Sequence, residues 1–147
     1  SKSYSMTGWR LGWVAGSQER IDKMLRIHQY AQACASAVSQ HAAVAALTGP
    51  QDSLLEMVGA FKQRRDILID GLIDMGLDVP IPKGAFYAFP TVPPGWIDGV
   101  LSHDVIVIPG SAFGDLGSGC ARIAYTVGID QLETAIDVMR QVTRSLN

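Results

Sequence analysis

Apolar residues recur at helical spacing in three long stretches of the chain. After Ser17, a suitable N-cap, Ile21, Met24 and Leu25 stand at this spacing and His28 continues their stripe, which predicts an amphipathic helix from residue 18 onward. The small residues of 31–47 predict a second, closely packing helix that ends at Thr48-Gly49-Pro50. A third helical period begins at Pro50 and stops at Gly76, where Leu77 is placed to pack back on Leu72 as in a Schellman cap.

Shorter apolar runs predict strands. Residues 11–16 and 105–108 are unbroken apolar runs closed by glycine or proline, and such runs are typical of buried strands. Residues 85–89 form an aromatic run that predicts another strand. Residues 78–81 allow at most an edge strand because they contain proline, and 96–103 allow at most two helical turns.

Two further elements complete the pattern. Ala121, Ile123 and Tyr125 alternate with Arg122, so a strand here would bury one face and turn the arginine to the other. From periodicity alone, Arg122 would be a solvent-exposed residue on an edge strand. The last helix has a predicted capping box at Asp130 and Glu133. Its apolar stripe consists of Leu132, Ile136, Met139, Val142 and Leu146.

Composition narrows the class of protein. The 147 residues are 48% hydrophobic and 18% charged, which indicates a globular chain. The net charge is −2 with lysine and arginine dispersed, so we expect no nucleic-acid partner, and no apolar run is long enough for a membrane span. Cys34 and Cys120 fit a reducing, cytoplasmic compartment and are expected to be small buried side chains. No metal site is predicted, and His28 is expected to pack as a neutral imidazole.

The first thirteen residues carry the chemistry. Lys2 and Arg10 stand eight positions apart around Gly8. A lysine attacks a carbonyl only as the neutral amine, and a second cation nearby favours loss of its proton. An arginine supplies that charge and can grip a phosphate with its planar fork. The pair therefore suggests a Schiff-base site for a phosphorylated aldehyde cofactor.

The full string Lys2-x-x-Ser5-Met6-x-Gly8-x-Arg10-Leu11-Gly12 resembles the cofactor attachment motif of class I and II aminotransferases, the fold-type I aspartate aminotransferase family. The resemblance implies that Lys2 binds pyridoxal 5'-phosphate covalently and acts as the catalytic acid and base. It implies that Arg10 binds the cofactor phosphate. It also implies a homodimer whose substrates are an amino acid, with aspartate as one candidate, and a 2-oxo acid.

A second part of the chain is similar to the same family. Arg122 follows the loop from Pro109-Gly110 to Phe113-Gly114 and precedes the closing helix, where the family has the arginine that binds the substrate α-carboxylate. The match favours this role over an exposed edge position. The string Gly84-Ala85-Phe86-Tyr87 is also similar, and its first aromatic lies near the substrate in the family, although we favour Phe86 as a core residue.

The predicted fold is α/β, the C-terminal part of a fold-type I enzyme. We expect 1–49 to be a remnant of the large cofactor-binding domain, 50–76 an interdomain helix and 77–147 a small α+β domain. A catalytic lysine at position 2, with no initiator methionine, predicts a fragment of a longer enzyme. The fragment is expected to be inactive alone, because most of the family's cofactor contacts would lie upstream.

Three other functions share these features. The first is another fold-type I activity on amino acids, such as a lyase, decarboxylase or synthase. The second is a non-catalytic structural or dimerisation module, because residues for the cofactor ring would lie upstream. The third is a transcription regulator that has borrowed an aminotransferase domain.

Overall fold

The structure is a computed structural model that describes residues 1–146. Its contacts divide the chain into two compact units, Ser1–Met57 and Val58–Asn147. The long helix α3 (Asp52–Asp74) begins in the first unit and continues into the second. Each unit is described by itself.

The N-terminal unit is built from helices and a looped start. It contains the 3-10 helix η1 (Thr7–Trp9), α1 (Gln18–Ala31) and α2 (Ala37–Thr48), so the helices expected after Ser17 and before Gly49 are confirmed. The strand predicted at 11–16 is wrong, because the segment has no regular structure. A strand forms only where its backbone pairs with that of another strand, and residues 1–57 offer no such partner to this segment.

No apolar side chain is buried within the N-terminal unit. Among residues 1–57 the only buried one is Ser39, and large apolar side chains such as Trp13 and Tyr30 are exposed. His28 and Cys34 are exposed as well, so their predicted packing is wrong. Helix α1 has the predicted apolar stripe, of which Ile21 is half-buried within the unit while Met24 and Leu25 are exposed.

Helix α3 ends as the sequence predicts. Gly76 has a φ of +80°, in the left-handed region that glycine adopts at no steric cost. The Leu77 N–H donates to the Leu72 carbonyl at 3.1 Å, and the Gly76 N–H donates to the Ile73 carbonyl at 2.8 Å. This is the Schellman arrangement, and both leucines are buried in the core.

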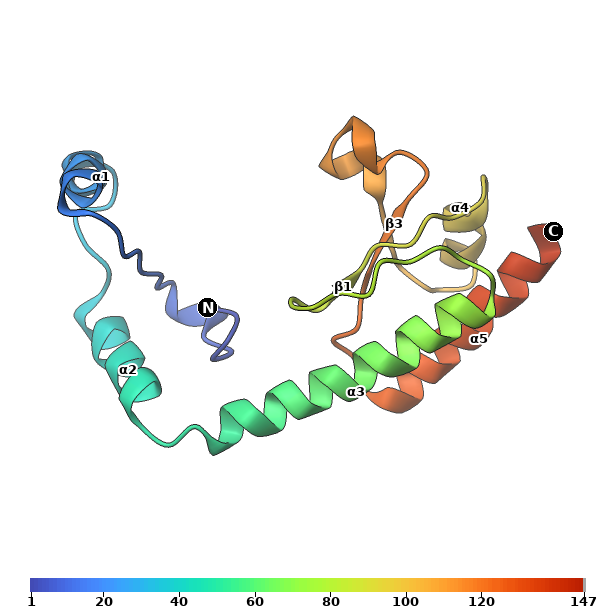
Figure 1. The fold of residues 1–147 in the computed structure, drawn as a ribbon, viewed down its shortest axis with the longest axis horizontal. Helices are drawn as coiled ribbons and strands as arrows, with labels where there is room; N and C mark the ends of the chain where they lie inside the picture. Colours follow the sequence, from blue (N-terminus) through green and yellow to red (C-terminus); the bar gives the residue numbers. More distant parts are fainter. Residues whose placement is uncertain (147) are drawn as a thin grey trace. The chain divides into compact units, whose positions relative to one another are not determined.

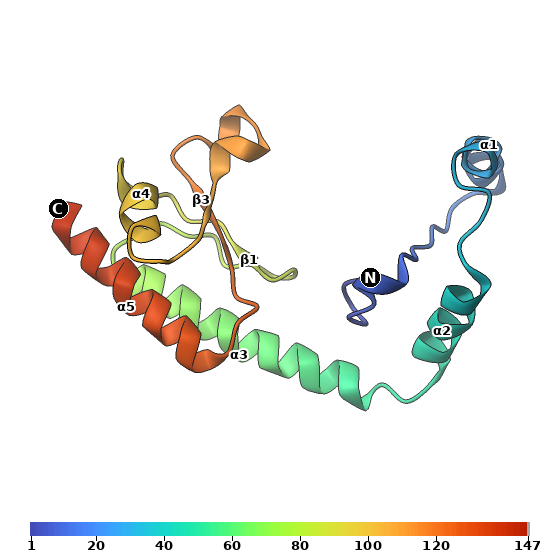
Figure 2. The same cartoon turned by 180° about the vertical axis from the view of Figure 1, so that it is seen from behind.

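A small antiparallel sheet and three helices form the C-terminal unit (Figures 1 and 2). The strand order is β1-β3-β2, so β3 lies in the middle, with Tyr87 opposite Ala124 and Ile108 opposite Arg122. Both views show α5 alongside the C-terminal half of α3. After α3, the elements in chain order are β1 (Tyr87–Ala88), α4 (Trp96–Leu101), β2 (Ile108–Pro109), the 3-10 helices η2 (Gly110–Phe113) and η3 (Asp115–Gly117), β3 (Ala121–Ala124) and α5 (Ile129–Leu146).

Several strands are shorter than predicted. Only Ile108 of the 105–108 run enters β2, and Ile106 is 78% exposed while Val107 is buried. The run therefore alternates, because β2 is an edge strand with one covered face. The aromatic run 85–89 contributes only two residues to β1, and 78–81 forms no strand.

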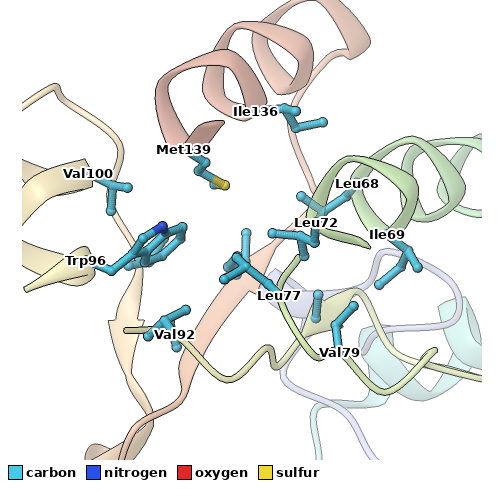
Figure 3. Packing of buried hydrophobic residues seen from close by; sticks show 14 of the residues in the cluster. Leu68, Ile69, Leu72, Leu77, Val79, Val92, Trp96, Val100, Ile136 and Met139 are labelled. Atoms are coloured by element: carbon cyan, nitrogen blue, oxygen red, sulfur yellow. The ribbon is translucent and has the colours of Figure 1, made fainter. Parts of the chain in front are cut away.

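The core of this unit lies between the sheet and the helices. Leu68 and Leu72 of α3 pack with Ile136 and Met139 of α5, and Trp96 of α4 closes one end (Figure 3). The buried face of β3 completes the core, as its alternation predicts, with Ala121, Ile123 and Tyr125. The indole N–H of the buried tryptophan donates to the Thr143 hydroxyl at 2.8 Å, so its polar group is satisfied.

The capping box predicted for the last helix is wrong. Helix α5 begins at Ile129, so Asp130 already lies in its first turn. The Gly128 carbonyl accepts a helical hydrogen bond from the Leu132 N–H at 3.0 Å, which gives the N-cap role to the glycine. The apolar stripe of α5 is buried as predicted except for Leu146, which is exposed.

Helices α3 and α5 pack closely at Gly71. A Cβ built there would lie 2.9 Å from the Ile136 Cγ2, whereas one at Gly59 in the same helix would meet nothing within 4 Å. Alanine in place of an open helical glycine stabilises by up to about 1 kcal/mol. We expect Gly59→Ala to raise the free energy of unfolding. The free energy of unfolding of Gly71→Ala should be about 1–3 kcal/mol lower than that of Gly59→Ala, because the two helices must move apart. Equal values in urea titrations would contradict the close contact.

Tyr125 makes the stability of this unit dependent on alkaline pH. Burial raises the pKa of its phenol above the ordinary 10.0; nearby Arg65 lowers it, and Asp66 raises it further. A raised folded-state pKa gives stability that is present below about pH 10 and is lost as pH rises through the folded pKa. We expect Tyr125→Phe to weaken this loss between pH 9 and about 12, measured as the free energy of unfolding. The exposed control Tyr30→Phe should leave the slope unchanged; identical slopes for both variants would contradict the assignment.

Candidate functional site

The first ten residues form a tightly turned loop. The Ser5 N–H donates to the Lys2 carbonyl at 3.2 Å, and the Met6 N–H donates to the Ser1 carbonyl at 2.9 Å. Ser5 and Arg10 both have a φ of 51°, in the left-handed region that non-glycine residues rarely adopt. Such conformations cost about 1–3 kcal/mol each and concentrate at binding sites.

Polar contacts from helices hold this loop. The Ser39 hydroxyl of α2 donates to the Trp9 carbonyl at 2.8 Å, and the Tyr4 phenol donates to the Gln51 side-chain carbonyl at 3.0 Å. Ser39 is 7% exposed, so the bond that it makes is shielded from water. The loop therefore depends on α2 and on the residue just before α3.

Lys2 and Arg10 both lie on this loop, and both side chains are exposed. One Nη1 N–H of Arg10 donates to the Thr7 carbonyl at 3.2 Å, which uses one of the five donors of the guanidinium. An amine for an aldehyde and a guanidinium for a phosphate are the donors that a phosphorylated aldehyde requires, so the set fits pyridoxal phosphate. A cavity of about 250 Å³ in the same unit is lined by Tyr4 and Met6, among others, but by neither cation.

Arg122 lies on the outer face of the central strand β3, and its side chain is half-buried. The exposed edge-strand position that periodicity alone suggested is therefore wrong. Its guanidinium carbon lies 4.5 Å from the centre of the Tyr87 ring and 4.6 Å from the centre of the Phe113 ring. Within residues 1–146 no carboxylate forms an ion pair with it. The arrangement presents a cation flanked by two aromatic rings.

The two rings reach Arg122 from different elements. Tyr87 is on β1, opposite Ala124, and therefore on the same face of the sheet as Arg122. Phe113 ends η2, in a loop closed by a contact between Gly110 and Gly117. A Cβ at Gly110 would lie 2.2 Å from the Gly117 carbonyl oxygen, so the loop cannot accept a side chain there.

The structure thus assigns the predicted site residues to two units. Lys2 and Arg10 belong to the first and Arg122 to the second. Phe86 packs against the core, as favoured from the sequence. The contact of Ser39 with the loop, and the two rings of Tyr87 and Phe113 that flank the arginine, are not apparent from the sequence. Strand register would have revealed Tyr87, but register is not visible in a run as short as β1.

Features of a metal site and of a membrane span are absent from residues 1–146. The described part of the chain contains no group of three or more histidine, cysteine or acidic side chains that could hold a metal ion. None of its helices has both the length and the apolar character needed to cross a bilayer. Both cysteines are unpaired, and Cys120 is only half-buried, where a buried side chain was expected.

Comparison with known proteins identifies the family. Residues 1–139 match the family described as aminotransferase class I and II. The chain belongs to this family, whose members depend on pyridoxal phosphate. The resemblance to this family is thereby confirmed over residues 1–139.

Curated relatives are similar over almost all of this chain. A probable aspartate aminotransferase of Methanocaldococcus jannaschii is 40% identical over 154 residues, which cover 97% of this chain and 40% of the relative. An LL-diaminopimelate aminotransferase of Moorella thermoacetica is 37% identical, with 97% and 38% covered. The chain therefore spans about two fifths of the length of these relatives.

Solved structures agree in fold. The aspartate aminotransferase from Rhizobium meliloti is 36% identical with a TM-score of 0.87, covering 99% of this chain and 40% of that one. An aromatic aminotransferase from Pyrococcus horikoshii OT3 is 35% identical with a TM-score of 0.90, covering 98% and 41%. The predicted α/β class, as part of a fold-type I enzyme, is confirmed.

The hydrogen bond from Ser39 is expected to stabilise the loop that carries both cations. Ser39→Ala leaves the Trp9 carbonyl without this partner, at a cost of about 1 kcal/mol. We expect the amides of Trp9 and Arg10 to exchange hydrogen about fivefold faster, the factor that corresponds to this energy. The control is Ser3→Ala, an exposed serine of the same loop. Equal exchange rates in the two variants would show that Ser39 does not hold the loop.

Proposed function

We propose that these residues form the C-terminal part of an aminotransferase that moves an amino group between an amino acid and a 2-oxo acid. The observation that carries the proposal is the family match, which extends over residues 1–139 and includes the cationic loop and Arg122. The relatives cited above are all named aminotransferases, which supports transamination over a lyase or synthase activity. We further propose 1–49 as part of the large domain, 50–76 as the connecting helix and 77–147 as the small domain.

Lys2 and Arg10 would hold the cofactor. Lys2 would bind its aldehyde covalently through the side-chain amine, and Arg10 would bind its phosphate through the guanidinium donors that Thr7 does not use. When bound, pyridoxal phosphate supplies an electron-accepting ring that stabilises negative charge at the substrate α-carbon. The Lys2 amine would also carry the proton to and from the substrate α-carbon as general base and acid.

Arg122 would bind the α-carboxylate of the substrate. A guanidinium and a carboxylate form two parallel hydrogen bonds, which fix the orientation of the substrate as well as its position. The side chain is half-buried and has no ion-pair partner within residues 1–146, so its charge is available to a ligand.

The names of the relatives bear on the amino donor. The relatives are named for aspartate, LL-diaminopimelate and aromatic amino acids. All of these carry the α-carboxylate that Arg122 would bind, so we propose an α-amino acid as donor, with aspartate as one candidate. A homodimer in the cytoplasm is also proposed, from the family resemblance and the two unpaired cysteines.

Borohydride reduction of the complete enzyme tests the role of Lys2. Reduction makes the bond between cofactor and lysine permanent, and peptide mass mapping then locates it. We expect the phosphopyridoxyl adduct on the peptide containing Lys2, and we expect its loss together with transaminase activity in Lys2→Ala. A matched control is Lys62→Ala, since Lys62 is an exposed lysine of α3. An adduct on another lysine of the unaltered enzyme would refute the assignment.

A further inference from the structure

Arg122 has two unusual neighbours for a half-buried arginine. Its guanidinium carbon lies within 4.6 Å of two ring centres, those of Tyr87 and Phe113. Contact with an aromatic ring is an attraction between the cation and the ring face, and it uses none of the five N–H donors. Among residues 1–146, no hydrogen bond or ion pair occupies these donors. The rings therefore restrain the group without competing for its donors.

A long arginine side chain otherwise has many rotamers. Binding a carboxylate through two parallel hydrogen bonds requires one orientation of the guanidinium, and ordering a free side chain costs affinity. The rings of Tyr87 on β1 and Phe113 on η2 would remove that cost by ordering the side chain before the substrate binds. No acidic side chain of residues 1–146 performs this task, and an acidic partner would compete with the substrate for the same donors.

The supports of the two rings are themselves fixed. Tyr87 belongs to β1, which pairs with β3 two residues beyond the arginine. Phe113 contacts Phe89 edge-on, with ring centres 6.1 Å apart, and ends the loop closed by Gly110 and Gly117. The two rings are thus held by separate backbone contacts.

We propose that Tyr87 and Phe113 are positioning residues that orient the Arg122 guanidinium for the substrate α-carboxylate. The inference rests on the proposed function, because it presupposes that Arg122 binds a carboxylate. It adds two residues that act through the arginine and do not themselves touch the reacting atoms. The rings should matter only for substrates that carry the carboxylate.

The test compares two substrates in the complete enzyme. One is the amino acid that reacts fastest in a donor panel, and the other is the corresponding amine without the carboxylate. Tyr87→Leu and Phe113→Leu are expected to raise KM for the amino acid by roughly three- to tenfold, the loss that one ring contact represents. The kcat/KM for the amine should stay the same. Tyr87→Phe keeps the ring and should restore KM to near the unaltered value.

Each outcome decides between defined alternatives. Phe113 is 53% exposed, so Phe113→Leu tests the proposal even where Tyr87→Leu fails to fold. An unchanged KM in Phe113→Leu, or an equal loss with amino acid and amine, would overturn the positioning role. Absence of transamination in the unaltered enzyme would instead refute the proposed function. An active enzyme in which Arg122→Gln leaves KM unchanged would refute the carboxylate role of the arginine.

Discussion

The two-residue period of strand β3 is the constraint on which the C-terminal unit depends. Its odd-numbered positions put Ala121, Ile123 and Tyr125 into the core against α3 and α5, while Arg122 faces the other way. A slip by one residue would bury the guanidinium and expose the apolar set. Because β3 is also the middle strand, both edge strands take their register from it. One short strand thus links the packing of the core to the direction in which Arg122, the proposed partner of the substrate carboxylate, points.

Features that depend on nearby residues in the sequence could be predicted, and features that depend on contacts with distant segments of the chain could not. Helix α3 and its Schellman end follow from the apolar period and from Gly76, which act within a few residues. The alternation of β3 was likewise readable. The strand at 11–16 and the full length of 105–108 were not, because strand formation depends on which backbone lies alongside. Burial depends on neighbours in the same way. Helix α1 has the predicted apolar stripe, but no residue of the helix is buried within its unit.

The candidate site shows the same division. Lys2, Arg10 and Arg122 were found because a motif fixes residue type and spacing. Ser39 and the rings of Tyr87 and Phe113 were found only in the structure, since they lie 30, 35 and 9 positions from the groups that they contact. Contacts of this kind depend on register and loop closure. The motif therefore identifies the groups that carry charge, and the fold identifies the groups that contact them.

The two units hold their cations by different means. Arg122 sits on a sheet that is fixed by a hydrophobic core, so its position depends on packing. The loop of Lys2 and Arg10 lies in a unit that buries no apolar side chain, and it is held by hydrogen bonds from Ser39 and Tyr4. Each such bond contributes about 1 kcal/mol, which is comparable to the cost of about 1–3 kcal/mol for each left-handed residue. The conformation of the loop therefore depends on a few polar contacts, whereas the position of Arg122 depends on a packed core.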